Sequence, residues 1–148
     1  MELSLPAYDY KVKKQNGAVF IFDDIRRKYV ALTPEEWVRQ HFIHYLITCR
    51  HYPAALIAVE KEIEMFGQKR RFDIVCFDRS SRPYLIVECK APAVMLTQSV
   101  FDQVFGYNLI MAAPYVAVTN GIVHHCGQVC PDRQFTLLTE IPEFGNIE

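Results

Sequence analysis

The sequence predicts a mixed α/β domain of the α+β kind, in which helices flank a mixed central β-sheet and an N-terminal β-hairpin precedes them. Short apolar runs rich in β-branched residues alternate with two longer segments of helical periodicity. An Asn16-Gly17 pair between two extended runs predicts the hairpin. With 148 residues, 51% of them hydrophobic, the chain is long enough to bury one core of its own.

We expect one domain over residues 1–148, in three parts. Residues 1–32 supply N-terminal strands, residues 33–125 form the core, and residues 126–148 supply a C-terminal strand and tail. Within the first part, Tyr29-Val-Ala-Leu32 is a short extended segment that leads into the first helix.

The first helix has a clear beginning. Thr33 is a good N-cap, Pro34 suits the first helical position, and Glu36 completes a capping box. An apolar stripe at helical spacing follows, made of Val38, Phe42, Tyr45, Leu46 and Cys49. The helix is expected to end at His51-Tyr-Pro53.

Residues 57–66 have the local propensity of a helix but the pattern of a strand. Glu60, Glu62 and Glu64 alternate with less polar positions, and this alternation favours a strand. Gly67-Gln68 then predicts a turn into the next strand.

The strand from Tyr84 to Glu88 ends in two charges separated by one residue. Because strand side chains alternate between faces, Glu88 and Lys90 should share one side of the sheet, with Cα atoms about 6.6 Å apart. Charges at an apolar strand end are rarely left unpaired. The simplest structural explanation is a salt bridge, and the functional one is a binding site.

The preceding run, from Arg71 to Asp78, supplies a second acid. A hairpin symmetric about Ser80 and Ser81 would pair Phe77 with Tyr84, Val75 with Ile86, and Asp73 with Glu88. Opposed side chains have Cβ atoms about 4.5–5.5 Å apart, and two carboxylates that close repel unless a cation lies between them. The spacing therefore predicts a divalent-metal site at Asp73 and Glu88, with Lys90 beside it.

The second half of the core predicts a helix and further strands. Residues 96–111 have helical periodicity, with Phe101, Phe105 and Leu109 along one side and Gln103 and Tyr107 one turn apart on another face. The expected strands after it are Tyr115–Thr119, Ile122–Cys126 and Phe135–Leu138.

The net charge, the apolar runs and the cysteines indicate which partners and which cellular location to expect. The net charge of −1 gives no overall attraction to nucleic acid, so phosphate contacts would depend on local basic clusters: Lys11–Lys14, Arg26–Lys28 and Lys69–Arg71. No apolar run has the length of a membrane helix, so no membrane partner is expected. Five irregularly spaced cysteines predict a reduced, cytoplasmic location. His124-His-Cys126 and Cys130 lack the spacing of a zinc finger.

Several segments in order resemble the PD-(D/E)xK nuclease superfamily, and more narrowly the amino-terminal nuclease domain of type I restriction enzyme R subunits. They span residues 29 to about 125 and comprise Thr33-Pro-Glu-Glu-Trp-Val-Arg-Gln40, Val59-Glu60, Arg71-Phe-Asp73, Ile86-Val-Glu-Cys-Lys-Ala-Pro92, Gln103-Val-Phe-Gly-Tyr107 and Thr119-Asn-Gly121. Phe72 stands where the superfamily name has Pro. The resemblance implies a restriction-endonuclease-like core.

The resemblance also implies roles for single residues. Asp73, Glu88 and the backbone carbonyl of Cys89 would ligate Mg²⁺, for which Mn²⁺ would substitute, and Lys90 would orient or deprotonate the attacking water.

Three other residues carry implied or alternative roles. Gln103 and Tyr107 match a motif that supports cleavage or DNA contact in this family, and the alternative for them is the polar edge of a packed helix. Glu36 matches an acid that often joins the metal shell in the superfamily, although capping the helix is a sufficient role for it.

The function expected from these features is that of a Mg²⁺-dependent endonuclease that hydrolyses phosphodiester bonds, most simply in DNA, with RNA left open. The alternative is a non-catalytic or partner-dependent nucleic-acid-binding module on the same fold. The sequence has no phosphate-binding loop of an ATP motor, so a separate motor or specificity subunit would be a partner. The oligomeric state stays open, a dimer included.

Overall fold

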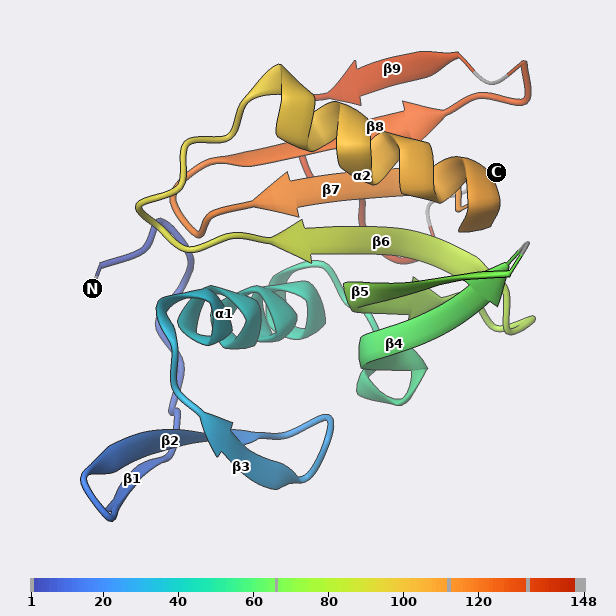
Figure 1. The fold of residues 1–148 in the computed structure, drawn as a ribbon. Coiled ribbons are helices and arrows are strands. Elements are labelled where there is room, and N and C mark those ends of the chain that lie inside the picture. The colour runs from blue at the N-terminus through green and yellow to red at the C-terminus, as the bar shows by residue number, and fades with distance from the viewer. Residues whose placement is uncertain (1, 66, 112, 133, 146–148) are drawn as a thin grey trace.

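The computed structural model describes residues 2–65, 67–111, 113–132 and 134–145 (Figure 1). Within these residues, two sheets and two α-helices follow in the order β1 (Val12–Gln15), β2 (Ala18–Asp23), β3 (Lys28–Ala31), α1 (Pro34–Cys49), the 3₁₀-helix η1 (Ala54–Leu56), β4 (Ile57–Met65), β5 (Gln68–Phe77), β6 (Pro83–Cys89), α2 (Gln98–Met111), β7 (Tyr115–Thr119), β8 (His124–Val129) and β9 (Phe135–Leu138). None of the helices in the described ranges is long and apolar enough to cross a membrane.

The N-terminal hairpin is confirmed and is part of a larger unit. Asn16 and Gly17 have φ angles of 54° and 79°, the left-handed values that a two-residue hairpin turn requires. β3 then pairs antiparallel with β2, so β1, β2 and β3 form a small three-stranded sheet. In Figure 1 this small sheet lies below α1, apart from the central sheet.

The central sheet is mixed, as the sequence predicts. Its strand order is β4-β5-β6-β7-β8-β9, with β6 and β7 parallel and the other neighbours antiparallel. α1 packs on one face, where Phe42 and Leu46 join the largest core cluster, while Phe101 and Val104 of α2 pack on Val116 and Val118 on the other. The two helices thus flank the sheet, and the expected α+β fold class is confirmed.

The start of α1 follows the predicted cap. The Thr33 hydroxyl accepts a hydrogen bond from the Glu36 backbone N–H at 3.0 Å, and Pro34 occupies the first helical position. The Glu36 carboxylate binds arginine side chains and not the cap backbone, so only half of the capping box forms as expected. Cys49 is exposed, because it lies in the last turn, beyond the part of α1 that the sheet covers.

The hairpin of β5 and β6 differs from the symmetric prediction at its turn. Val75 pairs with Ile86 as expected, but a bulge between Cys76 and Phe77 makes Phe77 pair with Pro83 and not with Tyr84. The irregular turn is closed by the Asp78 carboxylate, which accepts the backbone N–H groups of Ser80 and Arg82. The bulge lies at the turn end, so the register toward Asp73 is as predicted.

Two further strand predictions have different outcomes. Residues 57–65 form β4, so the alternating pattern outweighs the helical propensity. β8 begins at His124, whereas the sequence predicts a strand over 122–126. The reason is a turn in which the Asn120 side chain accepts the N–H groups of Ile122 and Val123, so these two residues do not pair in the sheet.

Candidate functional site

The two predicted acids meet where β5 and β6 leave their shared ladder. Ile74 pairs with Val87, and the next position along both strands sets Asp73 opposite Glu88. The Asp73 Oδ2 atom accepts the backbone N–H of Cys89 at 2.8 Å, which fixes the carboxylate against the end of β6. The backbone of β6 therefore fixes one oxygen of this acid.

Lys90 completes the group. Its Nζ lies 3.5 Å from Glu88 Oε1, so the two side chains share one side of the strand end as the alternation predicts. The Lys90 backbone N–H donates to the Thr119 carbonyl at 2.8 Å, which ties the residue to the parallel neighbour β7. The exposed fractions of Asp73, Glu88 and Lys90 are 14%, 22% and 29%, so a solvent-borne ligand can reach all three.

The environment of Glu88 disfavours its charged form. Burial raises the pKa of Glu88 to about 8, and the negative charge of Asp73 and a hydrogen bond with it add to the rise, against the opposing effect of Lys90. At neutral pH, a proton on Glu88 thus relieves the repulsion between the acids. A bound divalent cation would also relieve this repulsion, and its charge is twice that of a proton.

Glu35, exposed in the first turn of α1, is a further acid close enough to feel the charges of this site, and sequence reasoning missed it. Burial and the negative charge of Asp73 raise the pKa of Glu35, while Arg39 and Lys90 lower it. Its electrostatic neighbours are therefore the members of the candidate site. The signal was present in the adjacent Glu35-Glu36 pair, but the pair does not say which acid faces the sheet.

Glu36, for which the resemblance implies a place in the metal shell, is bound by two arginine side chains. Its carboxylate accepts from Arg39 at 2.6 and 2.8 Å and from Arg26 at 2.9 Å, and it is buried. Arg39 also donates to Asp73 Oδ1 at 3.1 Å. Glu36 is thus connected to Asp73 through the guanidinium of Arg39, which the sequence reasoning also missed.

An ionic network, largely buried except for the partly exposed Glu60, extends from this point to the small sheet. Arg26 bridges Asp23, Glu36 and Glu60, with its nitrogen atoms 2.6, 2.9 and 3.1 Å from their carboxylate oxygens. The amide of Gln40 donates to both Asp23 and Glu36. We name Asp23, Arg26, Glu36, Arg39 and Glu60 the buried ionic network. It joins α1 to β2 and β4, next to the candidate site.

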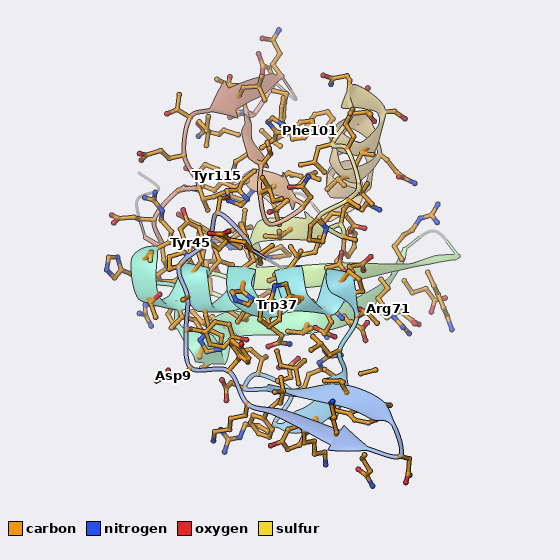
Figure 2. All side chains as sticks on the ribbon, turned by 90° about the vertical axis from the view of Figure 1, so that its left-hand side faces the viewer. Asp9, Trp37, Tyr45, Arg71, Phe101 and Tyr115 are labelled. Atoms are coloured by element: carbon orange, nitrogen blue, oxygen red, sulfur yellow. The ribbon has the colours of Figure 1, made fainter. Side chains whose placement is uncertain are left out.

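The remaining predicted residues lie elsewhere. Gln103 is exposed on α2, on the opposite side of the sheet from α1, and the side chain of Tyr107 lies outside the described residues. Of the predicted basic clusters, Lys69 and Arg71 lie on the β4–β5 hairpin, where each has a nitrogen within 4 Å of Glu62. Figure 2 labels Arg71, beside the end of α1.

Over the described ranges, no group of three or more His, Cys, Asp or Glu side chains is arranged to hold a metal ion. His124, His125 and Cys126 alternate along β8, with Cys126 buried and His125 exposed. A metal at the Asp73–Glu88 pair would consequently take its other ligands from backbone, water or substrate.

Comparisons with known proteins identify one family and one similar fold. The family model described as "Type I restriction enzyme R protein N terminus (HSDR_N)" matches residues 34–142. A solved fragment assigned as an HsdR subunit of a type I restriction enzyme from Vibrio vulnificus YJ016 has a similar fold, with a TM-score of 0.54 and 17% identity. That match covers 76% of this chain and 24% of the other, so the chain spans about a quarter of that structure's length. No curated protein matches.

The matched segment contains α1, both strands of the candidate site, and the whole central sheet. It extends over most of the chain. The chain therefore belongs to the family of the N-terminal domain of type I restriction enzyme R proteins.

Proposed function

We propose that this chain is a Mg²⁺-dependent nuclease domain that cleaves phosphodiester bonds in DNA at a centre formed by Asp73, Glu88 and Lys90. The observation that carries the proposal is the meeting of these side chains, in which a lysine lies 3.5 Å from one of two mutually repelling carboxylates. An accessible pair of acids that retains a proton at neutral pH suits a divalent cation. Family membership supports the same conclusion.

The donor set fits Mg²⁺. Asp73 and Glu88 offer hard carboxylate oxygens, and Mg²⁺ is usually held by one or two carboxylates together with water and substrate phosphate. The backbone carbonyl of Cys89 would be a third ligand, and Glu35 would face the same site from α1. Mn²⁺ would substitute. The bound ion would supply charge stabilisation at the scissile phosphate.

The protein's own groups have distinct tasks in this proposal. Lys90 would hold the attacking water by hydrogen bonding and neutralise charge that develops on the phosphate. Arg39 and the Cys89 backbone N–H hold the two oxygens of Asp73, so the carboxylate does not rotate during the reaction. Gln103 and Tyr107 would support cleavage or DNA contact from α2, as the resemblance implies.

The partners are part of the proposal. The similar structure from Vibrio vulnificus is described as a subunit of a type I restriction enzyme. By analogy, this domain would act with a motor and a specificity subunit that bring DNA to the site. Its activity alone would then be low.

A plasmid-nicking assay with Mg²⁺ tests the proposal. We expect Asp73→Asn, Glu88→Gln and Lys90→Ala each to lower the nicking rate roughly 10²-fold or more, because the first two weaken the metal ligands and the third removes the group that holds the water. Glu62→Gln is the control, since that acid is exposed on β4 and pairs with Lys69 and Arg71. Undiminished nicking in all three site variants would refute the assignment.

A second candidate function is a binding module without turnover, and one observation favours it. Arg39 already supplies a positive charge to Asp73 at 3.1 Å, so part of the need for a metal is met by the protein. Calorimetric titration with Mn²⁺ distinguishes the two functions when it is combined with the nicking assay. Metal binding with no cleavage of any DNA would favour the module.

A further inference from the structure

One face of the small sheet carries basic and aromatic side chains together. In the β1–β2 pair Lys13 lies opposite Phe20, and in the β2–β3 pair Phe22 lies opposite Tyr29. The Phe22 backbone N–H donates to the Lys11 carbonyl, so Lys11 is also adjacent to Phe22. Opposed residues share a face of a sheet. We name this face, formed by Lys11, Lys13, Phe20, Phe22 and Tyr29, the outer face.

The outer face points away from the rest of the molecule. On the opposite face Ile21 is fully buried, and Val12 and Val19 line a cavity of about 440 Å³ together with Trp37 of α1. Figure 2 shows the small sheet below α1, with side chains on its lower side directed away from the helix. Both lysines of the outer face are exposed, and Tyr29 is 37% exposed.

The cations are held against the aromatic rings. Lys13 Nζ lies 4.3 Å from the centre of the Tyr29 ring, while Lys11 Nζ and the Arg27 guanidinium lie 5.7 and 5.9 Å from the centre of the Phe22 ring. Such contacts are attractive and restrict the position of the charge without neutralising it. Binding of an anion then has less side-chain entropy to overcome.

The positive charge of this face is not balanced by nearby acids. Among the ion pairs of the described residues, none includes Lys11, Lys13 or Arg27. Because the whole chain has a net charge of −1, these cations form a local positive region on a molecule that is otherwise close to neutral or acidic.

We propose that the outer face is a sequence-independent contact surface for the phosphate backbone of DNA. The proposal deepens the proposed function, on which its choice of DNA as the nucleic acid rests. Several exposed cations on one face, held in place and without acidic partners, are the chemistry that binds the phosphates of nucleic acid. A membrane surface fits less well, because the rings that would insert into lipid are covered by the ammonium and guanidinium groups.

The small sheet lies outside the segment that the family model matches, which begins at residue 34. It is nevertheless fixed to the candidate site, because Arg26 at its β2–β3 turn pairs with Glu36 of α1. Arg39 continues the connection from Glu36 to Asp73. DNA bound on the outer face would therefore contact a part of the protein that is connected to the candidate site at Asp73 and Glu88.

The test is binding of a fluorescent DNA duplex, followed by anisotropy in EDTA at several salt concentrations, so that no cleavage occurs. The variant is Lys11→Gln/Lys13→Gln. The matched control is Arg79→Gln/Arg82→Gln, since both arginines are exposed and Arg79 likewise stacks on a ring, that of Phe144. We expect weaker binding by the first variant only, with the slope of log affinity against log salt smaller by about two. Lys11→Arg/Lys13→Arg should restore binding.

The outcomes separate this proposal from the proposed function. Unchanged affinity and slope in Lys11→Gln/Lys13→Gln, with thermal unfolding as in the wild type, would overturn the outer face as a DNA surface even if the wild type nicks plasmid. The expected loss in a protein that never nicks DNA would support the surface and refute the nuclease. Binding of phosphatidylserine vesicles without binding of DNA would overturn the proposal in favour of a membrane contact.

Discussion

At the scale of the residue, Glu88 has the most informative environment. It lies at the end of an apolar strand, beside Asp73 and Lys90, and burial raises its pKa to about 8. A carboxyl group whose pKa is higher in the folded than in the unfolded protein takes up a proton on folding in the pH range between the two values. The folded state then loses stability as the pH rises through that range.

This linkage gives a prediction with a definite sign. In the metal-free protein, the contribution of Glu88 to stability should fall as the pH rises from 4.5, the ordinary pKa of a glutamate, to about 8, its pKa in the folded protein. The stability of Glu88→Gln should depend less on pH over this range. Glu88→Gln should therefore melt a few degrees higher than the wild type at pH 8 in EDTA. Mg²⁺ should raise the melting temperature of the wild type and leave the variant nearly unchanged. Identical pH profiles for both proteins would contradict the environment described for Glu88.

Some residues of the candidate site could be predicted from the sequence and others could not. Asp73, Glu88 and Lys90 could be placed because strand alternation and hairpin register are local properties. Glu35 could not be chosen over Glu36, because successive helical residues point about 100° apart and the rotation of α1 about its axis depends on distant packing. The role of Arg39 depends on Asp73, which is 34 residues away in the chain.

At the scale of the element, α1 carries charge into a buried setting. Arg39 has 7% of its side chain exposed and binds Glu36, Asp73 and Glu60. Burying an ion pair gives little net stability, but removing one partner leaves the other charge without compensation. The polar side of α1 is for that reason as important for the fold as its apolar side.

Truncation of Arg39 should be costly. We expect Arg39→Ala to lower the free energy of unfolding by about 3–5 kcal/mol, because Glu36 and Asp73 lose their shared cation. Arg39→Lys should recover part of the loss, since a single ammonium cannot match the forked guanidinium. Urea denaturation measures both, with Arg71→Ala as the control, because its pair with Glu62 is exposed and should be worth less than about 1 kcal/mol. Equal effects of Arg39→Ala and Arg71→Ala would contradict the role of the buried ionic network.

Element boundaries were predictable where the signal is local. The cap at Thr33, the turn at Asn16-Gly17 and the alternation in residues 57–65 all act within a few residues, and each element forms as predicted. The bulge between Cys76 and Phe77 was missed because it depends on how the turn closes through Asp78.

At the scale of the whole molecule, a buried acid helps to hold the small sheet against α1. Asp23 is fully buried at the end of β2 and accepts hydrogen bonds from Arg26, Gln40 and the backbone N–H of Ile25. Burial alone would raise the pKa of Asp23, but the hydrogen bonds and charge of Arg26 and the hydrogen bond of Gln40 lower it below its ordinary value. The stability it contributes is hence present above pH 3.8 and is lost as the pH falls through the lower, folded value.

Neutralising this acid should loosen the small sheet. We expect Asp23→Asn to speed hydrogen exchange of the β2 and β3 amides at neutral pH while the central sheet stays protected, because the connection to α1 is weakened. Asp24→Asn is the neighbouring control, since Asp24 is exposed and pairs with His44. An equal increase in hydrogen-exchange rate over both sheets would show that they unfold together and that Asp23 does not specifically hold the small sheet to α1.

The central claim is that Asp73 and Glu88 together hold a divalent cation beside Lys90. The most direct measurement is anomalous scattering from a crystal soaked in Mn²⁺. The account predicts one strong peak in contact with both carboxylates, absent in Asp73→Asn. A nuclease-active protein whose Mn²⁺ peak lies away from this pair, or a soaked crystal with no peak at the pair, would contradict it.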